Sequence, residues 1–101
     1  MPTAFITAPP DAAAEIAGPL VDERLAACAN RVSCRSTYRW EGEVHDDEEE
    51  ILLAKTTHDA YPDLVERVEA LHPYDVPCIE RFEEDDVLAA FAEWRGDAVE
   101  K

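Results

Sequence analysis

Residues 51–57, with the sequence ILLAKTT, form a near-continuous apolar run, and this run decides the fold. A strand that is apolar on both faces is buried on both faces, so we expect residues 51–57 at the centre of a sheet. The six residues before it, 45–50, read HDDEEE and are all polar. We expect this polar segment to be a hairpin loop that leads into the central strand.

Three β-rich stretches lie on the N-terminal side of that loop. Residues 37–44 alternate around Tyr38, Trp40 and Val44, a pattern typical of a strand. Residues 28–32 predict another strand, which ends in a turn, and residues 5–8 predict a short first strand. These segments supply the remaining N-terminal part of the sheet.

A helix is predicted between the first two strands, over residues 12–27. Its apolar positions recur at helical spacing, as Ile16, Leu20, Val21 and Leu25. Asp11 is placed to cap the N-terminus with its side-chain oxygen. Pro19 lacks a backbone N–H, so we expect a kink there, or a break followed by a second short helix.

The C-terminal half predicts two more helices and one strand. Residues 59–71 have a helical apolar stripe, with Asp59 as a cap and Pro62 in the first turn. Residues 76–82 predict the last main strand, with Pro77 near its start. Residues 85–94 predict a short final helix. Its expected buried face consists of Val87, Leu88, Phe91 and Trp94.

The order of elements is therefore β-α-β-β-α-β followed by a helix. This is the ferredoxin-like order of the α+β class, in which helices cover one face of an antiparallel sheet. The chain has 101 residues, enough for one domain spanning residues 1–101. Because 47% of the residues are hydrophobic, a packed core is expected rather than disorder.

The charge balance excludes several functions. The net charge is −15, and only two of the nine basic residues are lysines, Lys55 and Lys101. Such a chain repels nucleic acids and anionic membrane surfaces. High Asp and Glu with little Lys resembles the proteins of halophiles, in which concentrated salt screens the self-repulsion. An ordinary acidic protein is the alternative.

The location is predicted to be cytoplasmic. No apolar run is long enough to span a membrane, and the N-terminus lacks the basic and apolar regions of a signal peptide. The three cysteines, Cys28, Cys34 and Cys78, are an odd number, which favours reduced thiols over a disulfide framework.

Four segments together resemble the CutA divalent-cation-tolerance family. They are LAACAN at residues 25–30, STYRWEG at 36–42, LAKT at 53–56 and HPYDVP at 72–77. The similarity runs in register over residues 4–95. It implies a ferredoxin-like homotrimer linked to tolerance of copper and other divalent metals, similar in architecture to PII-type signalling proteins. The sequence departs from the family where Cys78 replaces a usual Glu and where Phe91 replaces a usual Tyr.

The metal candidates are Cys28 and His72. Cys28 could supply a soft thiolate to copper or another thiophilic metal, and the alternative is a small core residue. His72 could bind as neutral imidazole, and the alternative is a residue favoured by the end of the helix. The cysteine and histidine spacings do not support a structural zinc site, and folding is not expected to require metal.

The cleft candidates are Tyr38, Trp40, Lys55, Tyr74 and Cys78. The aromatic residues could line a pocket or could pack in the core and between copies. Lys55 could bind an anionic effector or form an ion pair. No enzyme motif is present, so the main hypothesis is a non-enzymatic, metal-binding or metal-responsive homotrimer with sites between subunits. The alternative is a PII-like trimer that binds a small anionic effector or an unidentified protein partner.

Overall fold

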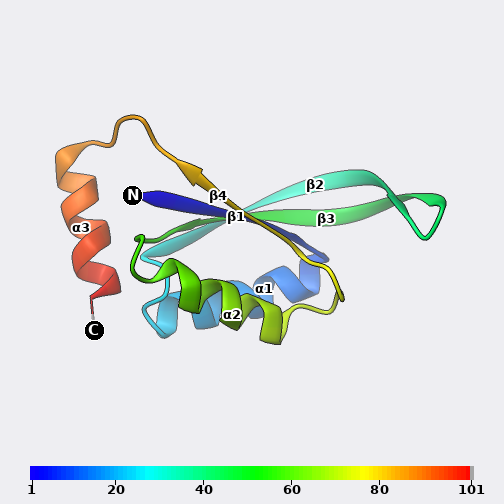
Figure 1. The fold of residues 1–101 in the computed structure, drawn as a ribbon, viewed down its shortest axis with the longest axis horizontal. Coiled ribbons are helices and arrows are strands. Elements are labelled where there is room, and N and C mark those ends of the chain that lie inside the picture. The colour runs from blue at the N-terminus through cyan, green and yellow to red at the C-terminus, as the bar shows by residue number, and fades with distance from the viewer. Residues whose placement is uncertain (101) are drawn as a thin grey trace.

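The computed structural model describes residues 1–100 and has the expected order of elements (Figure 1). The elements in chain order are β1 (Pro2–Ala8), α1 (Pro10–Asp22), β2 (Cys28–Trp40), β3 (Glu43–Lys55), α2 (Tyr61–Leu71), β4 (Cys78–Glu83) and α3 (Ala89–Val99). This confirms the ferredoxin-like βαββαβ fold with a C-terminal helix. None of the described helices is long and apolar enough to cross a membrane.

The sheet has four antiparallel strands in the order β2-β3-β1-β4. The predicted central run lies in β3, between β2 and β1. Helices α1 and α2 lie on one face of the sheet, as expected (Figure 1). The other face carries no helix within residues 1–100, and we call it the open face.

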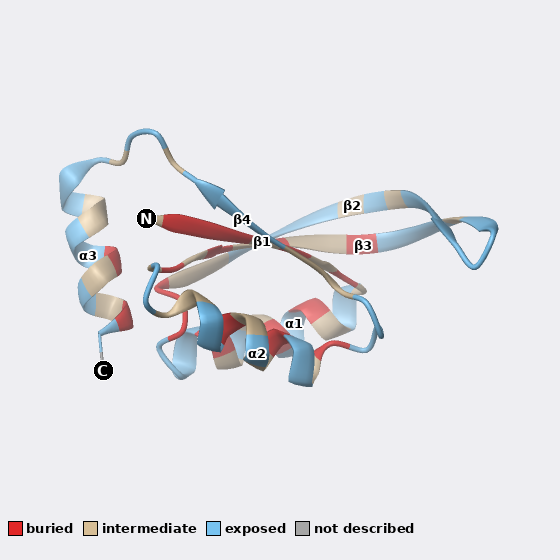
Figure 2. Cartoon of the chain, in the orientation of Figure 1, coloured by how far each residue is buried: buried red, intermediate tan, exposed pale blue. Residues whose placement is uncertain are grey.

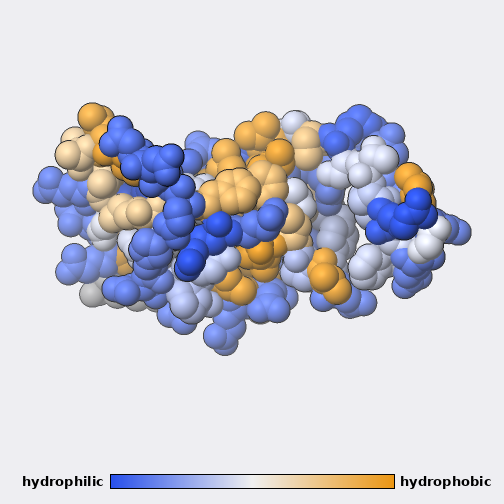
Figure 3. All heavy atoms as spheres, turned by 45° about the horizontal axis from the view of Figure 1, so that its top comes forward, coloured by the Kyte–Doolittle hydropathy of each residue, from blue (hydrophilic) through white to orange (hydrophobic). Residues whose placement is uncertain are grey.

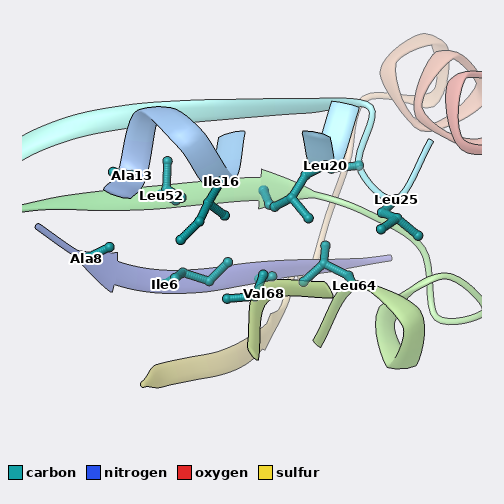
Figure 4. Packing of buried hydrophobic residues seen from close by; sticks show 12 residues of the cluster. Ile6, Ala8, Ala13, Ile16, Leu20, Leu25, Leu52, Leu64 and Val68 are labelled. Carbon is teal, nitrogen blue, oxygen red and sulfur yellow. The ribbon is translucent and has the colours of Figure 1, made fainter. Parts of the chain in front are cut away.

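The core lies between the sheet and these two helices (Figures 2 and 4). Strand side chains alternate between two faces, so every second residue of β1 and β3 points toward the helices. Helical spacing places the matching residues of α1 and α2 opposite them. The fully buried side chains of this cluster include Ala4, Ile6, Ala8, Ala13, Ile16, Leu20, Leu52, Ala54, Leu64 and Val68.

The predicted loop at residues 45–50 is wrong, and so is the predicted turn after residue 32. Both segments belong to the long strands β2 and β3, and the hairpin turn is at Glu41 and Gly42. Their φ angles are 52° and 80°, the left-handed conformation that a two-residue hairpin requires. The acidic segment pairs with a strand that carries arginines, and those cross-strand contacts stabilise it as a strand.

Helix α1 is shorter than predicted, and Pro19 does not break it. The helix continues through Pro19 and ends at Asp22, where the Glu23 N–H donates to the Pro19 carbonyl at 2.9 Å. Arg24 has a φ angle of 60°, which ends the helical path. Asp11 lies inside the first turn and makes no capping hydrogen bond.

Neither of the other helices begins where the sequence predicted. The N-cap of α2 is Ala60 rather than Asp59, and the hydroxyl of Thr57 accepts the Ala60 N–H at 3.2 Å. Helix α3 runs from Ala89 to Val99 rather than over residues 85–94. At α2 a local hydrogen bond from the Ala60 N–H to Thr57, rather than a cap at Asp59, precedes the first helical residue.

The predicted apolar face of α3 is also wrong. Leu88 is 76% exposed and Trp94 is 48% exposed, whereas Arg95 is buried. The Arg95 guanidinium donates to the Glu84 carboxylate at 3.1 Å and to the Pro2 carbonyl at 3.2 Å. Burial would raise the pKa of Glu84, but hydrogen bonds from Thr3 and Arg95 outweigh it and lower that pKa. The ion pair attaches α3 to the segment after β4, and the bond to Pro2 attaches it to β1.

The β2–β3 hairpin extends beyond the rest of the sheet. The last residue of β1, Ala8, pairs with Glu50, so residues 34–49 have no neighbour in β1 or β4. We call residues 34–49 the arm, and it forms the projecting end of the molecule (Figure 1). The arm accounts for the elongated dimensions of 45 × 26 × 19 Å.

Candidate functional site

A cavity of about 610 Å³ lies where the arm meets the segment that follows α2. The arm supplies one wall, residues 73–76 supply the opposite wall, and β1 and β4 supply the floor. The lining residues are Thr7, Ser36, Thr37, Tyr38, Trp40, His45, Glu49, Pro73, Tyr74, Asp75, Val76 and Cys78. Four of the five predicted cleft residues, all except Lys55, therefore lie around one cavity.

Strand alternation explains which arm residues face the cavity. Tyr38 pairs with His45 across the hairpin, and their rings stack with centroids 5.4 Å apart. Residues an even number of positions away on each strand share that face, which places Trp40 and Glu49 on it as well. This face continues the open face of the sheet.

Two phenols donate to two carboxylates beside the cavity. The Tyr74 hydroxyl donates to Glu49 at 3.0 Å, and the Tyr38 hydroxyl donates to Asp47 at 2.6 Å. Burial, followed by the hydrogen bond to Glu49, raises the pKa of Tyr74 far above its ordinary value. The hydrogen bond to Asp47 is the main cause of the raised pKa of Tyr38. Both phenols therefore stay protonated and act as donors.

His72 lies behind the cavity wall and holds it in place. Its Nε2–H donates to the Thr7 carbonyl at 2.8 Å, and its Nδ1 accepts the Tyr74 N–H at 3.1 Å. These partners fix the neutral tautomer with the proton on Nε2. Both ring nitrogens are used, so His72 could ligate a metal only by giving up one of these bonds.

Cys28 and Lys55 lie at the other end of the open face. Cys28 pairs with Lys55, and Lys55 pairs with Thr3 at the start of β1. His72 instead bonds to Thr7, four residues further along β1, which is roughly 13 Å at the rise of a strand. Cys28 and His72 therefore do not fit one metal site within a single copy. Among residues 1–100, no group of three or more His, Cys, Asp or Glu side chains is placed to hold a metal ion.

Cys78 is part of the cavity floor as a protonated thiol. Burial is the main cause that raises its pKa, and its Sγ lies 3.6 Å from Glu80, to which it donates. Metal coordination uses the thiolate form, which this environment disfavours.

Three polar groups at the cavity were not among the predicted site residues. His45 and Glu49 line the cavity, Asp47 accepts the Tyr38 hydroxyl beside it, and all three belong to the segment that was predicted to be a loop. A signal was present, because these three residues alternate in register with Ile51 and Leu53, which continue the same face of β3.

Comparisons with known proteins identify the family. The family described as CutA1 divalent ion tolerance protein matches residues 3–98. A divalent-cation tolerance protein CutA of Thermus thermophilus is 58% identical over 75 residues, which cover 72% of this chain and 73% of that protein. The corresponding protein of Pyrococcus horikoshii is 42% identical over 84 residues, which cover 83% and 82%.

Solved structures agree with this assignment. The crystal structure of CutA1 from Pyrococcus horikoshii has a TM-score of 0.94 at 37% identity and covers all of both chains. A PII-like protein CutA from Nostoc has a TM-score of 0.94 at 30% identity, covering 99% of this chain and 98% of that one. Since the family match spans nearly the whole chain and relatives above 30% identity share its fold, the chain belongs to the CutA family of divalent-cation tolerance proteins.

Proposed function

We propose that this chain acts in divalent-cation tolerance as a homotrimer, with the open face of the sheet as the contact between copies. The observation that carries the proposal is the apolar character of that face. Phe82 is 48% exposed and stacks on Phe5 with centroids 5.3 Å apart, and Val32 is 46% exposed. Hydrophobic residues gather near the middle of the surface that Figure 3 turns toward the viewer. A contiguous apolar patch on a small domain is typical of an interface.

We further propose that copper binds between copies. Cys28 lies on the open face, where a neighbouring copy could supply more ligands. A site of this kind would draw its ligands from several copies, because residues 1–100 of one copy gather no sufficient group. Thiolate ligands favour copper(I) and other soft metals. The role is proposed to be non-enzymatic, in keeping with relatives that are named as tolerance proteins.

Sedimentation equilibrium in molar sodium chloride tests the assembly. We expect a trimer mass for the parent chain and a smaller species for Phe82→Asp, which places a charge on the open face. Val44→Asp is the control, because Val44 is 63% exposed and lies near the tip of the arm, away from the centre of the open face. A monomer mass for the parent chain would contradict the proposal.

Calorimetric titration with copper tests the metal site. We expect Cys28→Ser to weaken binding, and Cys34→Ser, also on β2, serves as its control. His72→Ala should weaken binding only if copper displaces one of its two hydrogen bonds. Cys78→Glu, which restores the usual family residue, checks for an adventitious thiol site. Equal affinity in the parent, Cys28→Ser and His72→Ala would remove both residues as ligands.

A second candidate function, effector binding of the PII-like kind, is favoured by the cavity. The sequence analysis proposed an anionic effector because of Lys55. Lys55 does not line the cavity, and no other Lys or Arg does so within residues 1–100. An anionic metabolite that stays bound to the protein during purification would still support that alternative.

A further inference from the structure

We propose that the cavity beside the arm binds a small organic cation with a quaternary ammonium or amine group. All the residues that line the cavity come from one copy of the chain, and the inference requires that the proposed trimer leave the cavity open. The charge of the lining, the aromatic walls and the burial of one carboxylate support it.

The charge of the lining favours a cation. Glu49 and Asp75 line the cavity, and Asp47 accepts a hydrogen bond from the lining residue Tyr38. The two arginines of the arm, Arg35 and Arg39, alternate with Tyr38 and so lie on the opposite face of the hairpin, where Arg35 pairs with carboxylates of β3. Apart from His45, no residue that lines the cavity has a basic side chain.

The walls of the cavity are aromatic. Tyr38 and Trp40 lie on the arm, and Tyr74 lies across the cavity from them. Trp40 is 44% exposed and Tyr74 is 37% exposed within one copy, so part of each residue is left uncovered by its own chain. Aromatic rings attract cations through their faces, and several rings around one site are typical of quaternary ammonium recognition.

Glu49 is the group that a bound cation would compensate. Glu49 is 5% exposed, and its carboxylate receives a hydrogen bond from the Tyr74 phenol. Within residues 1–100 it has no ion pair, whereas its neighbours Glu48 and Glu50 both do. A buried carboxylate without a cation is costly, and a ligand that brings a positive charge would lower that cost.

A hard metal ion fits this lining less well than an organic cation. Calcium takes six to eight oxygen ligands, and magnesium requires octahedral oxygen geometry. The cavity offers two lining carboxylates among rings and aliphatic side chains. The aromatic surface that an organic cation would contact offers no oxygen ligands to a hydrated metal ion.

Calorimetry with three ligands of the same shape tests the proposal. The probes are choline, its neutral analogue 3,3-dimethyl-1-butanol and the anion 3,3-dimethylbutanoate, each titrated at pH 8 into the assembled protein in one sodium chloride buffer. We expect choline to bind about tenfold more tightly than the neutral analogue, and the anion to show no binding. Equal binding of choline and its neutral analogue, or tighter binding of the anion, would overturn the proposal.

Matched variants locate the binding. Glu49→Gln keeps the hydrogen bond from Tyr74 but removes the charge, and it should weaken choline binding about tenfold. Trp40→Leu should weaken it about three- to tenfold. Glu48→Gln removes the same charge from the opposite face of β3 and should change binding less than about twofold. Equal losses for Glu49→Gln and Glu48→Gln would mean that net charge alone attracts choline, and would overturn the site.

Two further measurements cover the remaining outcomes. If Glu49→Gln does not fold, Asp75→Asn removes the other lining carboxylate and should again weaken choline binding severalfold. Competition with calcium should leave choline binding unchanged. Displacement of choline by an equal concentration of calcium, or a structure of the assembled protein with a neighbour's side chain filling the cavity, would contradict the proposal.

Discussion

The two faces of the β2–β3 hairpin carry carboxylates on alternate residues but neutralise them differently. On the helix side, Arg31 pairs with Glu50 at 2.6 Å, and Arg35 lies 3.1 Å from Asp46 and 3.6 Å from Glu48. On the open side, Asp47 and Glu49 receive hydrogen bonds from tyrosine hydroxyls, and no Lys or Arg of the arm lies on that side. The helix side therefore has its charge balanced within the chain.

This difference between the two sides shows that the net charge of a chain does not locate its unpaired charges. The exposed ion pairs of the helix side contribute little to stability, because water screens them. On the open side, Glu49 is nearly inaccessible to water. Electrostatic interactions are stronger there than between groups exposed to water. Substitutions of chemically similar residues on the two faces should therefore differ in size and in sign.

The largest expected difference is between Tyr74→Phe and Arg35→Met. Tyr74→Phe removes the donor to a buried carboxylate and should lower the free energy of unfolding by about 1–2 kcal/mol. Arg35→Met breaks ion pairs whose side chains are 59% to 76% exposed and should cost less than about 0.5 kcal/mol. Urea unfolding followed by circular dichroism measures both. Equal costs would remove the distinction between the faces.

A smaller effect, with opposite signs, is expected for the two glutamates. At low salt, Glu49→Gln relieves repulsion on the open side of the arm, where no Lys or Arg lies, and should raise the melting temperature by about 3 °C. Glu48→Gln removes the partner of Arg35 and should leave the melting temperature unchanged or slightly lower.

High salt should remove the difference in melting temperature between Glu49→Gln and Glu48→Gln. The parent chain, with its net charge of −15, should itself melt higher as sodium chloride increases from about 0.01 to 1 M, because screening becomes complete over that range. A neutral osmolyte at equal concentration is the control and should raise the melting temperature far less. A flat response to sodium chloride would mean that self-repulsion does not limit stability.

In an alkaline titration, Tyr38 and Tyr74 should ionise at a higher pH than an ordinary phenol. The raised pKa values of Tyr38 and Tyr74 mean that both ionise later than an ordinary phenol with a pKa of 10.0. Their contribution to stability is present below about pH 10 and is lost as the pH rises above it. Absorbance of the phenolate should show a late component that Tyr74→Phe removes. A single ordinary transition would show that the open-face hydrogen bonds do not persist in solution.

The smallest effect concerns Glu50 on the helix side. The hydrogen bond from Arg31 lowers the pKa of Glu50 below its ordinary value of 4.5. The resulting stability is present above about pH 4.5 and is lost as the pH falls through the lowered pKa. Carboxyl NMR should show the pKa of Glu50 returning toward its ordinary value in Arg31→Met, and no change in that variant would contradict the assignment.

The sequence predicted the order of elements because that order depends on local spacing. Ile16 and Leu20 recur at helical spacing, and Leu52 and Ala54 lie in a strand-like run, so each segment identifies its own structure. Motifs at residues 36–42 and 72–77 also pointed to aromatic residues that the structure places around one cavity. These properties can be read from neighbouring residues alone.

Only the tertiary structure decided where the acidic segment and its charges lie. Residues 45–50 form a strand because they pair with residues 33–38, in which Arg35 donates to Asp46 and Tyr38 donates to Asp47 on the opposite face. The same pairing moves Lys55 to the far end of the open face and buries Glu49 beside Tyr74. Local polarity predicted a solvated loop, because the cross-strand partners that stabilise a strand are distant in the sequence and become neighbours only when the chain folds.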